Sequence, residues 1–285
     1  MKQLAKIPIT PVFPLCLGIL QQQSANRTYF FFVVKLYQGP IMFILLLSLG
    51  HTVKYFAKIC RIGDASCGSL SSYAYIVMMI HYLMNTTPPV LPCLQRLNKE
   101  TLPVSETSLS IDGWDCWFYS DLANLGDQWE KQPRNTQSVG ELWLGFLRYY
   151  TECFDWENHV VCIRLARADD PLTRKAKNWT KHRLAIEDPF ELTHNLAAGV
   201  SPKMALYILR SFGKARLLFG QCIDDFRPLE VRFNMEYFFN PKSLVEGNPP
   251  MDRNCFSCYK IGHQTKDCPL LLGSRQRRER PYNNG

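Results

Sequence analysis

The chain has 285 residues, of which 46% are apolar and 13% aromatic, so it can bury a sizeable core and is not a disordered protein. Its 16 glycines and 18 prolines, with no short repeat, exclude a collagen-like chain. The net charge is +8, and residues 251–285 hold seven Lys or Arg against three Asp or Glu. A basic tail of this kind favours an anionic partner, most commonly nucleic acid.

Residues 1–48 form an atypical apolar leader without any Asp or Glu; the first acidic residue of the chain is Asp64. The uninterrupted apolar run over residues 41–47 is far shorter than the ~20 residues of a membrane span, and it starts too late for a secretory signal. We therefore expect no membrane role. Eight of the eleven cysteines are scattered singly among apolar residues, which indicates reduced thiols and a cytoplasmic location.

Residues 51–61 predict a short helix that carries Lys54 and Lys58 one turn apart. Lysines at this spacing repel each other mildly, so they mark either a solvated face, the commoner case, or a site where an anion lies over both. A Gly/Ser-rich loop then leads into an apolar helix that ends at Asn85. Ser71 and Ser72 at its start either cap the helix or help to hold a phosphate.

Two further helices have clear start signals. Ser138 and Glu141 have the spacing of a capping box, and one apolar face follows over residues 139–150. Ser201 and Pro202 predict a second helix with proline at its first position. That helix is expected to turn these side chains inward: Met204, Ile208, Phe212, Ala215 and Phe219.

Between these helices, residues 160–165 and 184–188 predict two short strands, the second forced into an extended conformation by Pro189. Residues 187–195 follow at once and gather three acidic side chains and His194 around that proline. Polar side chains on a loop act in binding or catalysis more often than they pack. This segment is either a surface turn or a site.

The most specific pattern is near the C-terminus, where Cys255, Cys258, His263 and Cys268 have zinc-knuckle spacing. Three thiolates and one imidazole complete a tetrahedral zinc shell, and one bound zinc ion would fold a segment too small for a core.

The same segment carries an expected RNA-binding surface. Phe256 and Ile261 could stack on unpaired bases, as zinc knuckles do. Four arginines follow and either contact phosphates or form a solubilising tail: Arg275, Arg277, Arg278 and Arg280.

From Leu49 to about Cys268, the chain resembles the C-terminal catalytic module of vertebrate terminal uridylyltransferases with CCHC zinc fingers. The stretches that carry the resemblance are residues 53–60, 63–75, 112–114, 135–145, 187–190 with His194 and Asn195, 235–239 and the zinc-ligand pattern. The resemblance implies transfer of uridines from UTP to RNA 3′ ends.

The resemblance also implies individual roles. Lys54 and Lys58 would bind the triphosphate of UTP. Ser72 would contact the nucleotide, and Tyr73 would stack on uracil. The base edge would be lined by three side chains, of which the last would select uracil over adenine: Asp188, Glu191 and His194.

One departure from the family pattern concerns catalysis. Family members carry a palm domain with carboxylates that hold two Mg²⁺ ions before this region, and two-metal phosphoryl transfer needs those acids. No acidic residue precedes Asp64 here, so the sequence contains no candidate catalytic residue and looks like a truncated member that is inactive alone.

We therefore predict a mainly α fold with a few short strands. Residues 49–245 would form a helical nucleotidyltransferase domain, including a poly(A)-polymerase-associated region at about 138–190. A zinc knuckle over 251–270 and a basic tail over 271–285 would follow. The expected partners are single-stranded RNA 3′ ends and, weakly, UTP. The alternative is a non-catalytic, zinc-dependent module that binds RNA or protein.

Overall fold

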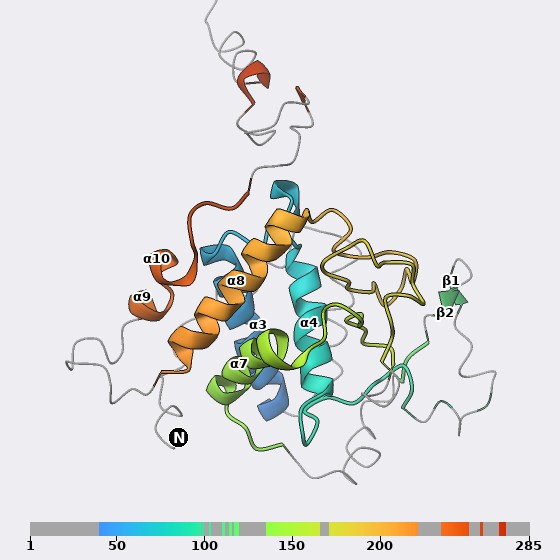
Figure 1. The fold of residues 1–285 in the computed structure, drawn as a ribbon. Helices are drawn as coiled ribbons and strands as arrows, with labels where there is room; N and C mark the ends of the chain where they lie inside the picture. Colours follow the sequence, from blue (N-terminus) through green and yellow to red (C-terminus); the bar gives the residue numbers. More distant parts are fainter. Residues whose placement is uncertain are drawn as a thin grey trace, which may run out of the picture.

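The computed structural model describes residues 40–97, 99, 103, 110–111, 114–115, 117–119, 135–165, 171–221, 235–250, 257–258 and 268–271. Figure 1 shows a helical body in these ranges. The elements are α3 (Pro40–Ile59), η2 (Ala65–Cys67), α4 (Ser72–Met84), β1 (Ser110–Ile111), β2 (Trp114–Asp115), α7 (Val139–Arg148), the π-helical η3 (Tyr149–Cys153), α8 (Pro202–Phe219), α9 (Met235–Phe238) and α10 (Pro241–Leu244). The predicted mainly helical fold is confirmed for this part of the chain.

The predicted helix starts are confirmed at three serines. The Ser71 side chain accepts a hydrogen bond from the Ala74 amide at the start of α4. Ser138 forms the expected capping box with Glu141 at the start of α7. Ser201 caps α8, with proline in its first turn. Each cap satisfies amide groups that the first turn of a helix leaves without partners.

Helix α3 is longer than predicted. Sequence analysis placed a helix over residues 51–61, whereas α3 begins at Pro40 and ends at Ile59. It therefore includes the apolar run at 41–47 and crosses the boundary that we placed after residue 48. Leu46 near the end of the run and Leu49 just after it are fully buried, so this part of α3 contributes to the core. Among the described residues, no helix has both the length and the apolar composition of a membrane span.

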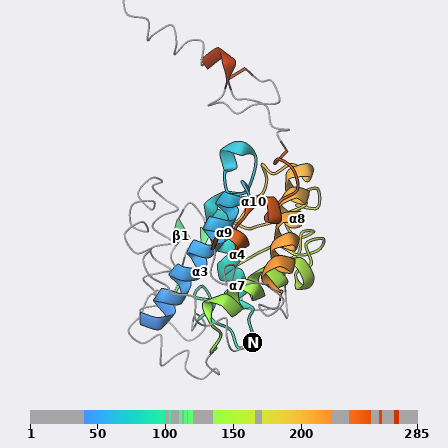
Figure 2. The same cartoon turned by 90° about the vertical axis from the view of Figure 1, so that its left-hand side faces the viewer.

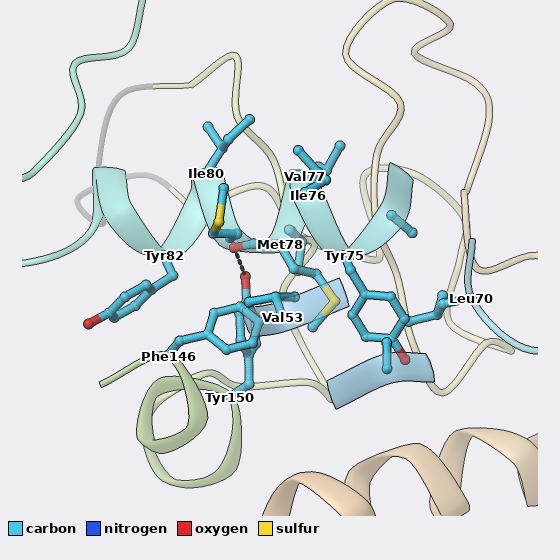
Figure 3. Close-up of a cluster of buried hydrophobic side chains, with 14 of the residues drawn as sticks. Val53, Leu70, Tyr75, Ile76, Val77, Met78, Ile80, Tyr82, Phe146 and Tyr150 are labelled. Carbon is cyan, nitrogen blue, oxygen red and sulfur yellow. Dashed lines mark hydrogen bonds between the residues drawn. The ribbon is translucent and has the colours of Figure 1, made fainter. Parts of the chain in front are cut away.

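The core lies between four helical elements. Helix α3 packs against α4 and α7, and α8 packs against α7, η3 and α10. Helix α4 is buried on all sides, from Ala74 to Met84. Figure 3 shows Phe146 and Tyr150 facing the side chains of α4, where the Tyr150 hydroxyl donates to the Met78 carbonyl at 2.8 Å.

Phe212 anchors α8 in this core. It is 1% exposed, and its ring lies 5.4–6.5 Å from four other aromatic rings, those of Phe56, Tyr75, Phe146 and Tyr150. The inward face predicted for α8 is confirmed for Met204, Ile208, Phe212 and Ala215, while Phe219 is half-buried.

The two predicted strands at 160–165 and 184–188 are wrong as strands. Val161 and Ile186 form a single parallel bridge, and the bonds continue no further. On the edge facing Val161, Pro189 has no amide hydrogen to offer, and on the opposite edge the amide of Ile186 donates to the Asn195 side chain at 3.0 Å. A side chain and a proline thus replace the hydrogen bonds that would extend a ladder. The one short sheet among the described residues pairs β1 with β2, antiparallel.

Candidate nucleotide site

The segment that sequence analysis left open, residues 187–195, is a closed loop that we call the polar turn. Glu187 and Asn195 form an antiparallel bridge at its base. Inside it, the Asp188 amide donates to the His194 carbonyl at 3.1 Å, and the His194 amide donates to the Glu191 carbonyl at 2.8 Å. Asp188 Oδ1 accepts from the amides of Phe190 and Glu191, which is the bonding of an Asx turn. The backbone is thus fixed from within.

Asn195 ties the base of the turn to the preceding segment. The residue is 3% exposed. Its Oδ1 accepts from the amides of Ile186 and Ala197, both at 3.0 Å, and its Nδ2 donates to the Leu184 carbonyl at 3.4 Å. One amide side chain therefore makes three backbone hydrogen bonds that a β ladder would otherwise supply.

Glu187 is a buried carboxylate beneath the turn, with 1% of its side chain exposed. Arg164 contacts both of its oxygens, with Nε 2.7 Å from Oε2 and Nη2 3.2 Å from Oε1. Lys177 Nζ lies 2.5 Å from Oε1, and the Cys162 thiol donates to Oε2 at 3.0 Å. Four contacts satisfy one buried charge, which is the condition under which a carboxylate tolerates burial.

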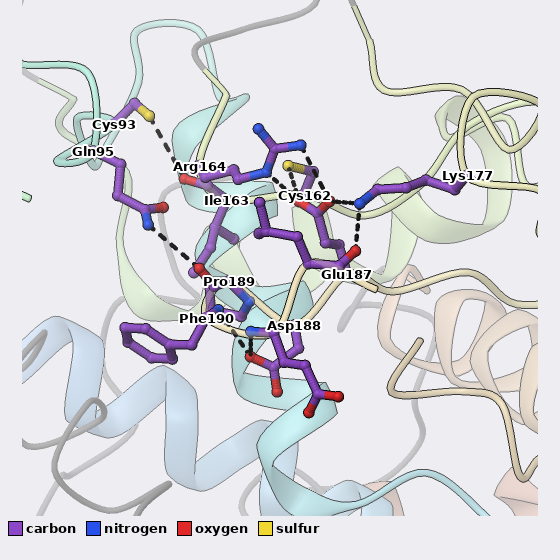
Figure 4. A network of polar contacts seen from close by, with 12 residues as sticks. Cys93, Gln95, Cys162, Ile163, Arg164, Lys177, Glu187, Asp188, Pro189 and Phe190 are labelled. Carbon is purple, nitrogen blue, oxygen red and sulfur yellow. Dashed lines mark hydrogen bonds and ion pairs between the residues drawn. The ribbon is translucent and has the colours of Figure 1, made fainter. Parts of the chain in front are cut away.

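This cluster shifts the acidity of its neighbours. Burial, together with the Glu187 charge, raises the pKa of the Cys162 thiol to about 12, so Cys162 stays protonated. Burial by itself would lower the pKa of Arg164, but its bonds to Glu187 outweigh that effect and raise it. Figure 4 shows Glu187 and Asp188 projecting to different sides of the chain, Glu187 toward the two cations and Asp188 away from them.

Asp188, Glu191 and His194, predicted to line a base edge, are brought together on the outer side of the turn. His194 Nδ1 lies 3.9 Å from Asp188 Oδ2 and 3.8 Å from Glu191 Oε2. These distances are too long for direct hydrogen bonds. His194 is 47% exposed and Glu191 is 64% exposed, whereas Asp188 is 14% exposed. The three side chains therefore lie close together without hydrogen bonds to one another, so their polar atoms can bind a ligand.

The other predicted residues lie at one end of the α3–α4 pair. Lys54 and Lys58 are one turn apart near the end of α3, and Ser72 and Tyr73 form the first turn of α4. Lys58 and Ser72 are exposed, while Lys54 and Tyr73 are half-buried. Figures 1 and 2 place this end of the pair beside the start of α8, which follows the polar turn in sequence. The convergence of these residues and the turn on one nucleotide stays a prediction.

The zinc-ligand pattern is described only in part. Cys258 is half-buried and Cys268 is fully buried, whereas Cys255 and His263 lie outside the described residues. The predicted RNA-contacting residues also lie outside them: Phe256, Ile261, Arg275, Arg277, Arg278 and Arg280. Within the part of the chain that the structure describes, no group of three or more His, Cys, Asp or Glu is placed to hold a metal ion.

Known proteins resemble this chain in sequence and in structure. A family model described as Cid1 family poly A polymerase matches residues 138–194. The chain is 42% identical to human terminal uridylyltransferase 7 over 277 residues, and 47% identical to mouse terminal uridylyltransferase 4 over 223 residues. A crystal structure of the Cid1 poly(U) polymerase with Mg and 3′-dATP bound superimposes with a TM-score of 0.58 at 32% identity. These matches relate the chain to the terminal uridylyltransferase family.

The family match covers this chain more fully than it covers the relatives. It extends over 96% of this chain but 18% of the human terminal uridylyltransferase 7, and over 78% of this chain but 13% of the mouse relative. For the Cid1 structure it covers 73% of this chain and 60% of that one. The chain therefore spans less than a fifth of the length of terminal uridylyltransferases 7 and 4.

The family model places the polar turn within a known region. It begins at Ser138, the cap of α7, and ends at His194, close to the 138–190 predicted for the poly(A)-polymerase-associated region. Sequence analysis singled out Asp188, Glu191 and His194 but missed Glu187 and Lys177 as the support beneath them. The sequence did contain one signal of a buried carboxylate, since Glu187 directly follows an apolar segment. Its cationic partners could not be identified from the sequence, because they lie 10 and 23 residues away.

Proposed function

We propose that this chain forms the nucleotide-binding, base-selecting part of a terminal uridylyltransferase, which adds uridines from UTP to RNA 3′ ends. The observation that carries the proposal is the grouping of Asp188, Glu191 and His194 on one rigid turn inside the region that matches the Cid1 family. Cid1 has been crystallised with the UTP analogue UMPNPP and with the product ApU. Cytoplasmic location is part of the proposal.

The chemistry of the turn suits the edge of uracil. Uracil presents a carbonyl oxygen where adenine presents an amino group, so a donor at that position accepts uracil and opposes adenine. A His194 ring N–H can supply this donor, since the imidazole is exposed and can take either tautomer. A site that hydrogen-bonds one edge leaves polar groups unsatisfied with the wrong base, at about 1–3 kcal/mol each.

The α3–α4 pair would bind the rest of the nucleotide. Lys54 and Lys58 supply positive charge for the triphosphate, and Ser72 lies at the N-terminal end of α4, where amide groups favour an anion. Tyr73 would stack on the base. The Cid1 structure with Mg and 3′-dATP supports Mg²⁺ as the cofactor of the family reaction.

A nucleotide titration followed by NMR tests the proposal with UTP and ATP on wild type, His194→Ala and Tyr73→Ala. We expect tighter binding of UTP than of ATP, and a gap that narrows about tenfold in His194→Ala. Tyr73→Ala should weaken both nucleotides alike, because stacking tolerates any base. His182→Ala is the matched control, a histidine outside the polar turn. Equal affinities in the wild type, or an unchanged gap in His194→Ala, would contradict the proposal.

The alternative function, a zinc-dependent RNA-binding module, is favoured by the Cys255, Cys258, His263 and Cys268 spacing and by the four arginines that follow it. Titration of a fluorescent RNA oligomer with and without a zinc chelator distinguishes the two. Loss of RNA binding on chelation, with no nucleotide discrimination, would support the alternative. Chelator-insensitive RNA binding would argue against it.

A further inference from the structure

Lys177 contacts the polar turn at two points, at its base and near its tip. Its ammonium lies 2.5 Å from Oε1 of Glu187, at the base of the turn. The same ammonium donates to the backbone carbonyl of Leu192, near the tip of the turn. It also lies 5.2 Å from the centre of the Trp179 ring, a cation–π distance. With 16% of its side chain exposed, Lys177 is held in this position on several sides.

The Glu187 charge does not require Lys177. Arg164 already contacts both oxygens of Glu187, and Cys162 donates to one of them. Either cation alone would therefore neutralise the carboxylate. The contact that Lys177 adds, and that Arg164 does not make, is the one to the Leu192 carbonyl, between Glu191 and His194.

We infer that Lys177 is a positioning residue, which fixes the conformation of the polar turn by tying the Leu192 carbonyl to the buried Glu187 carboxylate. Lysine suits the role because its ammonium has three donors and can serve a carboxylate and a carbonyl together. A turn held at base and tip presents the side chains of Asp188, Glu191 and His194 in one arrangement. The consequence for base selection rests on the proposed function, whereas the consequence for the turn itself does not.

Amide hydrogen exchange in the nucleotide-free protein tests the inference directly. The amides of Asp188 and His194 are bonded within the turn, and their exchange reports how often it opens. In Lys177→Met we expect both to exchange at least about tenfold faster, the effect of losing one charge-assisted hydrogen bond. Arg164→Met is the matched control, since it also leaves Glu187 with one cation but keeps the Leu192 contact. Lys177→Arg should restore slow exchange.

Several results would overturn the inference. Equal exchange in Lys177→Met and wild type would do so, as would equal acceleration in Arg164→Met. Loss of the fold in Lys177→Met, with Arg164→Met still folded, would assign Lys177 to general stability and also overturn it. The Lys177→Met variant, with its turn opened, should also discriminate UTP from ATP less well than the Arg164→Met variant does. If the wild type does not discriminate at all, the proposed function fails, and hydrogen exchange still decides the role of Lys177.

Discussion

His81 is a titratable side chain enclosed in the core. It is 8% exposed, and its Nδ1 lies 3.1 Å from the Tyr150 hydroxyl. That hydroxyl donates to the Met78 carbonyl, so Nδ1 carries a proton and donates toward Tyr150. Burial lowers the pKa of His81 to about 3, so near pH 7 the imidazole is neutral and its single proton is on Nδ1.

The buried His81 should weaken the folded state in mild acid. In the unfolded chain this histidine has a pKa near 6.5, whereas in the folded protein its pKa is about 3. Between these two pH values the unfolded state therefore binds a proton that the folded state does not bind. The free energy of unfolding then falls as the pH falls through this window, by about 2 kcal/mol at pH 5 from His81 alone.

Urea unfolding at pH 7.5 and pH 5.0 measures this effect in wild type and in His81→Asn, which keeps a donor near Tyr150. We expect the wild type to lose more stability than the variant between the two pH values. The same loss in both proteins would show that other groups cause the acid sensitivity.

Gly145 permits the close approach of α7 to Tyr82 on α4. A Cβ at this position would lie 2.1 Å from the Tyr82 hydroxyl oxygen and 3.1 Å from the ring carbon that carries it. Gly145→Ala should therefore destabilise the protein by about 1–3 kcal/mol, although alanine is the better helix former. Thermal or urea unfolding measures the change.

Gly213 provides the control for that substitution. It lies within α8, and a Cβ there would meet nothing within 4 Å. Gly213→Ala should stabilise the protein by about 0.5–1 kcal/mol through helix propensity alone. Adding Tyr82→Phe to Gly145→Ala removes the nearest clashing atom and should recover much of the loss. If the double variant recovers no stability, the clash is between the helix backbones and not with the Tyr82 hydroxyl.

At the scale of elements, the helix starts were predictable and the support of the site was not. Ser71, Ser138 and Ser201 each accept from the amide three residues further on, so a short window of sequence contains the whole interaction. The contact between Lys177 and Leu192 joins residues 15 apart, and that between Arg164 and Glu187 joins residues 23 apart. No local pattern encodes such pairs.

The start of α3 shows a second limit of sequence patterns. The run at 41–47 is apolar throughout, so it has no periodic polar face from which to recognise a helix. Its partners come from elsewhere: α3 packs against α4 and α7. Likewise the strand predicted at 184–188 has the right residues, but Asn195 occupies the hydrogen-bonding position of a neighbouring strand. Tertiary contacts decided both cases.

The zinc knuckle gives a prediction for one element. We expect the reduced protein to bind one zinc ion through Cys255, Cys258, His263 and Cys268. Cys258→Ser should abolish that binding and unfold residues 251–270 while the melting of the helical body stays the same, because metal and fold are coupled in so small a segment. Elemental analysis and circular dichroism measure the two effects.

Cys153→Ser is the control for Cys258→Ser, since Cys153 is an exposed thiol outside the zinc pattern. It should leave the zinc content unchanged. Reduced wild-type protein without bound zinc would contradict the predicted knuckle.

At the scale of the whole molecule, one prediction concerns catalysis and starts from the sequence, in which no Asp or Glu precedes Asp64. We expect the purified polypeptide to add no uridine to an RNA oligomer in the presence of UTP and Mg²⁺, because phosphoryl transfer by two metal ions requires acidic ligands. Extension of a labelled RNA, resolved on a denaturing gel, is the measurement. Magnesium-dependent extension by clean protein would contradict the prediction.

The polar turn differs from the helical body in how it can form during folding. The helices can begin from neighbouring residues, whereas the buried Glu187 at the base of the turn has its full set of partners only when Arg164, 23 residues away, has joined it. It should therefore assemble late, on helices that are already packed. A nucleotide that binds at the turn would then bind only to fully folded chains, so the bound fraction would measure the fraction of chains that have completed folding.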